Sequence, residues 1–178
     1  MTDPLRGLLD AAIEGDDVAL ADLVRCTQDD LWRLCCLLGS GDAEDLVQET
    51  YLRAVGSLRS YRGDAPVRSW LMAIARHVCA DQVRARQRHR RLVRKVTDHQ
   101  RANVSIDGHL EAEVGAPTAA LVDHLEPARR EAFLVTQVIG LSYDEAAVVI
   151  GCPIGTIRSR VARARGDLAD MVRRADIA

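Results

Sequence analysis

Residues 140–165 read G-L-S-Y-D-E-A-A-V-V-I-G-C-P-I-G-T-I-R-S-R-V-A-R-A-R, and this stretch decides the class of fold. Ser142 and Glu145 have the S-x-x-E spacing of a capping box, which predicts a short helix that ends at Gly151. After Pro153, apolar residues recur at helical spacing and predict a second helix with one buried stripe. That stripe comprises Ile154, Ile157, Val161, Ala164 and Leu168. A short helix, a tight turn and a second helix with a basic face predict a helix-turn-helix.

The polar side of this second helix is typical of DNA recognition. Its side chains are Thr156, Ser159, Arg160 and Arg163. A helix fits the major groove of DNA, arginine donates two hydrogen bonds to guanine, and serine or threonine bonds to phosphates or bases. The alternative is an ordinary helical hairpin with a solvated basic face. The capping box, the glycine before the turn and the Arg/Ser/Thr face together favour DNA recognition.

Two further helical stretches are predicted in the first third of the chain. Apolar residues fall at helical spacing from Leu5 to Leu38, and Gly39-Ser40-Gly41 interrupts the pattern. Asp42 is a suitable N-cap for the next helix, whose apolar face runs from Ala43 to Leu58. The polar residues that project from its other sides include Asp45, Gln48, Glu49 and Arg53.

A third, long helix is predicted from Val67 to about Arg91, since Pro66 suits the first turn of a helix. Its apolar stripe comprises Val67, Trp70, Leu71, Ile74 and Val78, and its other side carries Arg68, Arg76, His77 and Arg84. Seven arginines lie between Arg76 and Arg94. A few cations suffice to interact favourably with the negative C-terminal end of a helix dipole. The larger number here favours nucleic-acid binding over a solvated helix end.

Charge is arranged in blocks along the chain, although the net charge is only −2. Residues 1–50 carry a net −9, residues 51–101 a net +10, residues 102–151 a net −6 and residues 152–178 a net +3. Two basic blocks separated by an acidic one indicate two separate contacts with a polyanion. The acidic blocks indicate either solvated faces or surfaces that dock a basic protein.

Composition excludes several other classes of protein. Aromatic residues make up 3% of the chain, which disfavours a large aromatic-lined catalytic cavity and an all-β core. A stretch of 18 apolar residues or a secretion signal is absent from the sequence, so we expect a cytoplasmic protein without membrane insertion. The five cysteines lack the spacing of zinc ligands, so we expect structural thiols, no metal and no cofactor.

The predicted organisation is all-α, with two small helical domains and a flexible linker. Residues 92–118 show no sustained apolar period and contain Gly108, Gly115 and Pro117. We therefore predict a first domain over residues 1–91, a linker over 92–118 and a helix-turn-helix domain over 119–178.

Three motifs in this order resemble the extracytoplasmic-function (ECF) sigma factors, the small two-domain promoter-recognition subunits of bacterial RNA polymerase. The run D-A-E-D-L-V-Q-E-T-Y-L-R-A at 42–54 is similar to the region 2 helix that docks on polymerase. The run S-W-L-M-A-I-A-R-H-V-C-A-D-Q-V-R at 69–84 is similar to the segment that melts and reads the −10 element. Residues 140–165 are similar to region 4, which reads the −35 element, and most resemble the actinobacterial sigma C-like group.

The resemblance implies a binding protein, not an enzyme, with defined contact residues. Partners would be the β′ and β subunits of core polymerase, promoter DNA and an anti-sigma protein. Polymerase contacts would be Asp45, Gln48, Glu49 and Arg53. Contacts to the −10 element would be Arg68, Trp70, Arg76, His77, Arg84 and Arg88. In the −35 groove, the base-facing residues would be Ser159, Ala162 and Arg163, and the residues that hold phosphates would be Thr156, Arg158 and Arg160.

Two of these positions depart from the pattern of the family. His77 stands where many members have an asparagine in a pocket for a flipped −10 base, so the preferred base should differ. Ala162 lacks the larger side chain often found there and leaves only apolar contact, for example with a thymine methyl group.

Two other functions are alternatives to a sigma factor. A stand-alone helix-turn-helix regulator would use residues 1–100 for dimerisation or an effector and would bind duplex DNA without polymerase. A small enzyme built on Cys79, His77 and Asp81 is disfavoured, because residues two apart on a helix do not face each other.

Overall fold

The computed structural model describes residues 3–96, 110 and 115–175, and within them the regular elements are all helical. The chain divides into two compact units, residues 1–106 and 107–178. The prediction of an all-α protein with two small helical domains is confirmed. The predicted linker over 92–118 lies mostly outside the described residues, and its boundaries stay a prediction.

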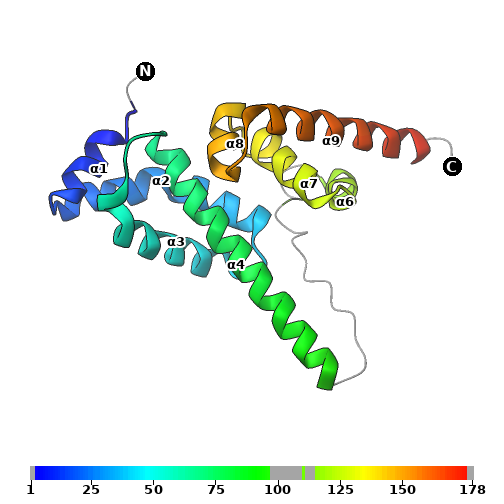
Figure 1. Ribbon diagram of the computed structural model, residues 1–178, viewed down its shortest axis with the longest axis horizontal. Coiled ribbons are helices and arrows are strands. Elements are labelled where there is room, and N and C mark those ends of the chain that lie inside the picture. The colour runs from blue at the N-terminus through cyan, green and yellow to red at the C-terminus, as the bar shows by residue number, and fades with distance from the viewer. Residues whose placement is uncertain (1–2, 97–109, 111–114, 176–178) are drawn as a thin grey trace. The chain divides into compact units, whose positions relative to one another are not determined.

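The N-terminal unit is a bundle in which α2 packs against three other helices, and α3 also packs on α4 (Figure 1). Its elements are α1 (Arg6–Ile13), α2 (Asp17–Leu38), α3 (Ala43–Ser57), the 3₁₀ turn η1 (Leu58–Ser60) and α4 (Val67–Val96). The buried core includes Leu31 and Leu34 of α2, together with Leu71 and Met72 of α4.

The apolar pattern from Leu5 to Leu38 belongs to two helices. Gly15 has a φ of 98°, a left-handed conformation that glycine adopts without strain, and it ends the first helix. Asp16 then caps α2 by accepting hydrogen bonds from the backbone N–H groups of Val18 and Ala19, at 2.9 and 3.1 Å. The apolar spacing continues across this break, so it does not reveal that the stretch forms two helices.

Buried thiols behave as the apolar core residues that the sequence predicts. Cys35, Cys36 and Cys79 lie inside the N-terminal unit. The neighbouring Cys79 thiol, together with burial, raises the pKa of the Cys35 thiol far above its usual range. Burial also raises the pKa of Cys36 to about 11. Both thiols therefore stay protonated at neutral pH and pack as small hydrophobic groups.

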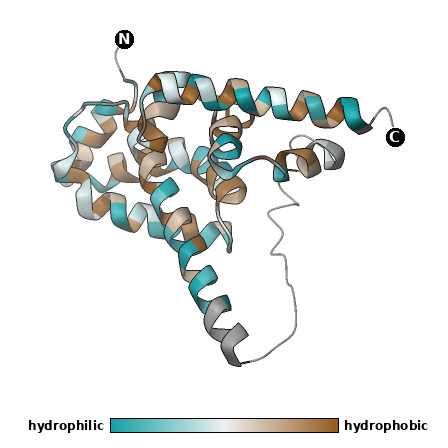
Figure 2. Ribbon diagram, turned by 45° about the vertical axis from the view of Figure 1, so that its right-hand side comes forward, coloured by the Kyte–Doolittle hydropathy of each residue, from teal (hydrophilic) through white to brown (hydrophobic). Residues whose placement is uncertain are grey.

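Helix α4 changes character along its length. It has 30 residues and is about 45 Å long, since an α-helix rises about 1.5 Å per residue. Among the residues of α4 whose side chains the structure describes, the buried ones all lie between Val67 and Cys79, in its first half. Hydrophilic residues dominate its second half (Figure 2). The helix runs to Val96, five residues beyond the predicted end at Arg91, and it presents an extended basic arm.

The C-terminal unit is built around α9, which packs against α6, α7 and α8. Its elements are α6 (Ala116–Asp123), α7 (Pro127–Phe133), the π-helical turn η2 (Leu134–Val138), α8 (Tyr143–Ile150) and α9 (Ile154–Ala175). The stripe predicted for α9 is correct in its centre, because Ile157, Val161 and Ala164 are buried. Pro127 is the first residue of α7, and the helix continues into a π turn before Gly140.

Candidate nucleic-acid and polymerase interfaces

Local sequence fixes the turn between α8 and α9. The Ser142 hydroxyl accepts a hydrogen bond from the Glu145 backbone N–H at 3.2 Å, and the Glu145 carboxylate accepts from the Ser142 N–H at 2.9 Å. This is the predicted capping box. At the other end, Gly151 has a φ of 74° and its N–H donates to the Ala147 carbonyl at 2.9 Å. A left-handed glycine ends α8 and directs the chain into α9.

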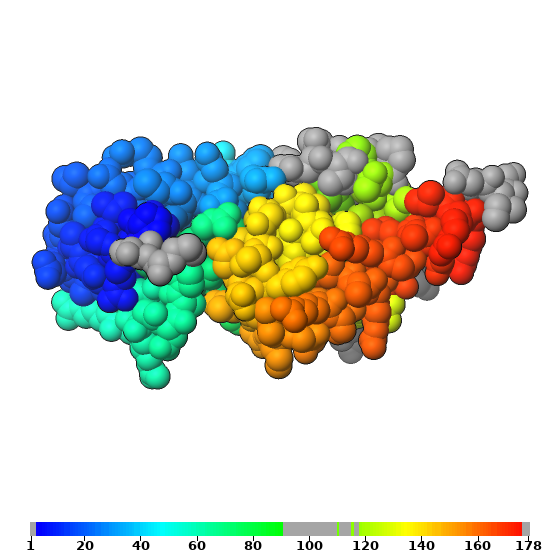
Figure 3. Space-filling view, turned by 90° about the horizontal axis from the view of Figure 1, so that it is seen from above, coloured from blue at the N-terminus to red at the C-terminus, as the bar shows by residue number. Residues whose placement is uncertain are grey.

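Helix α9 presents most of the predicted −35 residues to solvent. Arg158, Ser159, Ala162 and Arg163 are exposed, and Thr156 and Arg160 are half-buried. Figure 3 shows α9, coloured orange to red, as a continuous ridge on the surface of its unit. The exposed side therefore combines two arginines, a hydroxyl and a methyl group, which matches the chemistry of a major-groove reader.

Sequence reasoning missed an arginine at the edge of this ridge. Arg165 donates from Nη2 to Oε1 of Gln137 at 2.5 Å, and Gln137 donates from Nε2 to Oγ1 of Thr136 at 2.9 Å. Thr136 and Gln137 lie in the π turn, which shifts their side chains from the positions that a regular α-helix gives. Only the structure reveals this contact, because helical spacing assumes 3.6 residues per turn.

Three of the predicted −10 residues on the first half of α4 are half-buried. Arg68 is half-buried and donates to both carboxylate oxygens of Asp30 on α2, at 2.5 and 2.9 Å. Trp70 is also half-buried, and its ring centroid lies 5.2 Å from that of Tyr61. Both side chains therefore have structural contacts within the N-terminal unit. Arg76 is half-buried as well.

His77 is exposed and has a defined orientation. Its Nδ1 lies 2.7 Å from the carbonyl oxygen of Ala73, one turn earlier in α4. A carbonyl oxygen only accepts, so Nδ1 carries the hydrogen. In the neutral ring, Nε2 is then the acceptor that points away from this bond. The structure thus presents His77 as a hydrogen-bonding group on the surface of α4.

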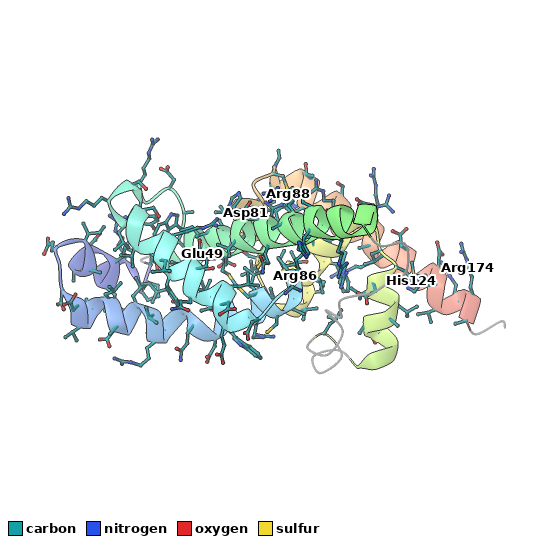
Figure 4. The ribbon with its side chains drawn as sticks, turned by 90° about the horizontal axis from the view of Figure 1, so that it is seen from below. Glu49, Asp81, Arg86, Arg88, His124 and Arg174 are labelled. Carbon is teal, nitrogen blue, oxygen red and sulfur yellow. The ribbon has the colours of Figure 1, made fainter. Side chains whose placement is uncertain are left out.

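The second half of α4 is the basic arm. Arg84, Arg88 and Arg90 are exposed and Arg86 is half-buried. Figure 4 shows Asp81 near the middle of α4 and Arg86 and Arg88 beyond it, on different sides of the helix. Arginines on several sides of an extended helix suit a flexible polyanion that wraps around it.

Three predicted contact residues form one surface network between α3 and α4. Arg53 donates to Glu49 at 2.7 Å and to Asp81 at 2.9 Å, and Arg84 donates to Asp81 at 2.7 Å. The Arg84 and Arg53 guanidinium groups lower the pKa of Asp81 to about 2. The network joins Glu49 and Arg53, predicted to bind polymerase, to Arg84, predicted to bind DNA.

A groove of about 410 Å³ lies between α2 and α3. Its apolar lining comes from Val24, Trp32, Val47 and Tyr51, and its polar lining comes from Gln28, Asp29, Glu44 and Gln48. Trp32 is 41% exposed there, which is unusual for so large an apolar side chain. Gln48 is one of the predicted polymerase contacts, but Trp32 is not, because nothing in the sequence indicates which side of α2 stays uncovered.

The same two units match known sequence families. The sigma-70 region 2 family matches residues 23–91, and the sigma-70 region 4 family matches residues 118–168. The chain is 44% identical to the ECF RNA polymerase sigma factor SigC of Mycobacterium tuberculosis, over 89% of this chain and 85% of the relative. The chain belongs to the family of ECF RNA polymerase sigma factors.

Another relative and two solved structures are also similar to this chain. The ECF sigma factor SigE of Mycolicibacterium smegmatis is 33% identical over 88% of this chain and 63% of the relative. CnrH, solved with the cytosolic domain of CnrY, has a TM-score of 0.70 and 27% identity, covering 94% of this chain and 96% of CnrH. RpoE of Bartonella quintana, solved with the anti-sigma factor NepR, has a TM-score of 0.67 and 28% identity, covering 86% and 96%.

Membership of this family decides between the two functions that the sequence left open, a sigma factor and a stand-alone helix-turn-helix regulator. This ECF sigma factor is a transcription-initiation protein of the sigma-C type, and the stand-alone regulator is not supported. Sigma factors are not enzymes. Among the described residues, none of the helices is long and apolar enough to cross a membrane. The described part of the chain also holds no group of three or more His, Cys, Asp or Glu side chains placed to bind a metal.

Proposed function

We propose that this sigma factor directs core RNA polymerase to its promoters through three separate surfaces. Helix α9 reads the −35 duplex, helix α4 binds the melted −10 strand, and the α2–α3 surface docks on polymerase. The observation that carries the proposal is the exposed Arg158, Ser159, Ala162 and Arg163 on a helix set by a capped helix-turn-helix. Polymerase supplies the chemistry, and this chain supplies the sequence preference.

On the −35 element, Ser159, Ala162 and Arg163 face the base edges. Arg163 is exposed, and its planar guanidinium can donate two hydrogen bonds to a guanine. Ala162 contributes a methyl contact that suits thymine. Thr156, Arg158 and Arg160 hold phosphates on either side, which fixes the register of the helix without reading sequence.

On the −10 element, the basic arm of α4 holds the phosphates of the separated strand, and His77 hydrogen-bonds a base. The roles assigned to Arg76, Arg84 and Arg88 are phosphate contacts. Trp70 offers an aromatic ring near the start of the helix. Unstacking a base costs a few kcal/mol per step, and contacts made only to the separated strand offset that cost. Such contacts favour the open promoter over the duplex.

The polymerase-docking surface combines the α2–α3 groove with the polar residues of α3. Asp45 and Gln48 are exposed, and Glu49 and Arg53 are held in the ion-pair network. The apolar floor at Trp32 and the acidic rim suit a helix that carries both apolar and basic side chains. We assign this partner to the β′ subunit, and a second contact from the region 4 unit to the β subunit.

Regulation by an anti-sigma protein is part of the same proposal. RpoE of Bartonella quintana was solved with the anti-sigma factor NepR, and CnrH was solved with the cytosolic domain of CnrY. A partner that covered the α2–α3 groove would block polymerase docking. Because core polymerase is its target, the sigma factor would act in the cytoplasm.

Run-off transcription tests the proposal. Purified chain and bacterial core polymerase are combined with a promoter library randomised at both elements, and transcripts that depend on the chain are sequenced. We expect enriched bases at two positions about two helical turns apart. Duplex binding by the chain alone, with neither transcription nor co-elution with core polymerase, would contradict the proposal.

A further inference from the structure

Two arginines share one carboxylate on α4. Asp81 accepts a hydrogen bond at Oδ1 from Nη2 of Arg84, three residues further along the same helix, at 2.7 Å. Its other oxygen, Oδ2, accepts from Nη1 of Arg53 on α3, at 2.9 Å. Helices α3 and α4 pack against each other, so the second bond bridges them. Because each oxygen serves a different arginine, a change at one arginine alters what the carboxylate offers to the other.

Arg53 is itself divided between two carboxylates. Its Nη1 donates to Asp81, and its Nε donates to Oε1 of Glu49, one turn earlier in α3, at 2.7 Å. Figure 4 shows Glu49 and Asp81 on these two helices. A guanidinium is a planar fork, which binds a carboxylate most strongly through two parallel hydrogen bonds. Arg53 makes one bond to each partner, so it gains a second bond to Asp81 only by leaving Glu49.

The bonds of this network are weak enough to exchange. The side chains of the four residues, Glu49, Arg53, Asp81 and Arg84, are between 42% and 60% exposed. Exposed ion pairs contribute little to folding, so another charged group can replace either partner at a small cost in free energy. Arg84 and Arg53 also lower the pKa of Asp81 to about 2, so its carboxylate is ionised at neutral pH.

The two ends of the network belong to different proposed surfaces. Glu49 lies on the surface assigned to polymerase, and Arg84 lies on the surface assigned to the −10 strand. A basic side chain of polymerase that pairs with Glu49 would release Nε of Arg53. Arg53 would then bind both oxygens of Asp81 and compete with Arg84, whose guanidinium would become available to a DNA phosphate. Because coupling between two binding sites is reciprocal, a phosphate on Arg84 would in turn favour the pairing of polymerase with Glu49.

We infer that Asp81 is a positioning residue that links the two surfaces, because it restrains Arg84 and loosens this restraint when polymerase engages Glu49. The inference rests on the proposed polymerase and −10 surfaces. Asp81 itself contacts neither partner and acts through Arg53 and Arg84. A simple brace between α3 and α4 would change thermal stability but would leave the two binding events independent of each other.

The test compares the isolated full chain with holoenzyme assembled from the same chain and core polymerase. The probe is fork DNA, a duplex with a single-stranded extension of the non-template strand, at low salt, where arginine-rich surfaces bind DNA most tightly. Asp81→Asn removes the shared charge and keeps the shape. Asp22→Asn is the matched control for net charge, because Asp22 pairs with Arg25 on α2 at the same three-residue spacing.

Two further variants, Arg84→Ala and Arg84→Ala combined with Asp81→Asn, complete a double-mutant cycle that shows whether Asp81 acts through Arg84. The affinity of each variant for core polymerase is measured without DNA. The thermal midpoint of each isolated variant shows whether the substitution affects folding.

We expect Asp81→Asn to tighten the binding of fork DNA in both forms, by a factor about two- to fivefold larger in the isolated chain than in holoenzyme, where polymerase has already loosened the restraint. The gain should vanish when Arg84 is alanine. Without DNA, Asp81→Asn should bind core polymerase about twofold more weakly, because Arg53 then rests on Glu49 alone. Asp22→Asn should show neither effect.

Equal gains in the isolated chain and in holoenzyme, or a gain that persists without Arg84, would mean that Asp81 does not link the two surfaces, although the surfaces themselves stand. The same conclusion follows if the isolated Asp81→Asn chain binds fork DNA no more tightly than Asp22→Asn. If wild type binds no core polymerase, or its holoenzyme binds no fork DNA, the proposed function is wrong and the inference fails with it.

Discussion

Asp30 on α2 accepts hydrogen bonds from Nε and Nη2 of Arg68 on α4, at 2.5 and 2.9 Å. Both side chains are less than one-third exposed. The two parallel bonds tie two core helices together at the point where the proposed −10 surface begins. Arg68 is therefore a structural residue of the N-terminal unit, and the exposed His77, further along α4, is better placed as a direct contact.

Replacing Asp30 should make stability less sensitive to acid. The Arg68 guanidinium lowers the pKa of Asp30 below its unfolded value of about 3.9. Because the folded pKa is depressed, the pair stabilises fully above pH about 4 and loses its effect as the pH falls through the folded pKa. We expect Asp30→Asn to cost about 1 kcal/mol in urea unfolding at pH 7, and less at pH 3.

The neighbouring carboxylate provides the control for this pair. Asp29 is exposed and lines the groove between α2 and α3. Asp29→Asn should leave the free energy of unfolding nearly unchanged at both pH values. Equal destabilisation by the two variants, or a loss from Asp30→Asn that does not shrink in acid, would show that the Arg68 pair does not stabilise the bundle.

Asp81 restrains two arginines, and its removal should strengthen DNA binding. Arg53 and Arg84 both donate to this exposed carboxylate, and they lower its pKa to about 2. At neutral pH the carboxylate is charged and competes with DNA phosphates for Arg84. Asp81→Asn keeps the shape and removes the charge. We expect tighter binding of single-stranded DNA by the holoenzyme, with a salt dependence steeper by about 0.7 per added phosphate contact.

A second exposed Asp–Arg pair offers a matched comparison for that experiment. Asp22 accepts from Arg25 on α2 with the same three-residue spacing. Asp22→Asn changes net charge equally but lies outside the proposed DNA surface. If both variants steepen the salt dependence to the same extent, the gain comes from overall charge and Arg84 makes no specific phosphate contact.

The sequence predicts best where structure is set by local residues. The capping box at Ser142 and Glu145 and the left-handed Gly151 define the helix-turn-helix within ten residues, so they can be identified without any tertiary information. The contact between Asp3 and Val67 spans 64 residues and has no local signal. The same holds for the groove at Trp32, because its exposure depends on how α2 and α3 pack.

Residue roles were harder to predict than the fold. Arg68 and Trp70 fall within a motif of the right type, yet their contacts with Asp30 and Tyr61 appear only in three dimensions. The break at Gly15 was missed because the apolar spacing continues from α1 into α2. The π turn at Leu134–Val138 was missed because its spacing departs from 3.6 residues per turn.

Two glycines should respond in opposite ways to alanine. A Cβ on Gly39, between α2 and α3, would lie 2.4 Å from Cδ1 of Leu46 and 2.5 Å from the backbone oxygen of Cys35. The backbone oxygen cannot move without disturbing α2, so Gly39→Ala should destabilise the protein by about 1–3 kcal/mol. Gly56 lies inside α3 with nothing within 4 Å of such an atom, so Gly56→Ala should stabilise by about 0.5–1 kcal/mol.

Urea unfolding of the full chain measures both glycine variants. The Gly39→Ala midpoint should fall and the Gly56→Ala midpoint should rise, with unchanged slopes. A Gly39→Ala midpoint at or above wild type would mean that the approach of α3 to the end of α2 is looser than the structure shows.

Arg163 should read a single base pair of the −35 element. It is exposed on α9, on the side opposite the buried Ile157 and Val161. If its guanidinium bonds to a base edge, Arg163→Ala should cost about 1–3 kcal/mol on the preferred promoter and relax the preference at one position only. Holoenzyme binding to a duplex library, randomised one −35 position at a time, measures both quantities.

Arg174→Ala is the control for the loss of one positive charge, because Arg174 is exposed on the same helix near its far end (Figure 4). Arg174→Ala should change affinity little and alter no base preference. Uniform weakening of Arg163→Ala on every sequence, with a shallower salt dependence, would instead make Arg163 a phosphate contact. The base-reading role would then pass to Ser159 and Ala162, whose short side chains reach a base edge only if α9 lies deeper in the groove.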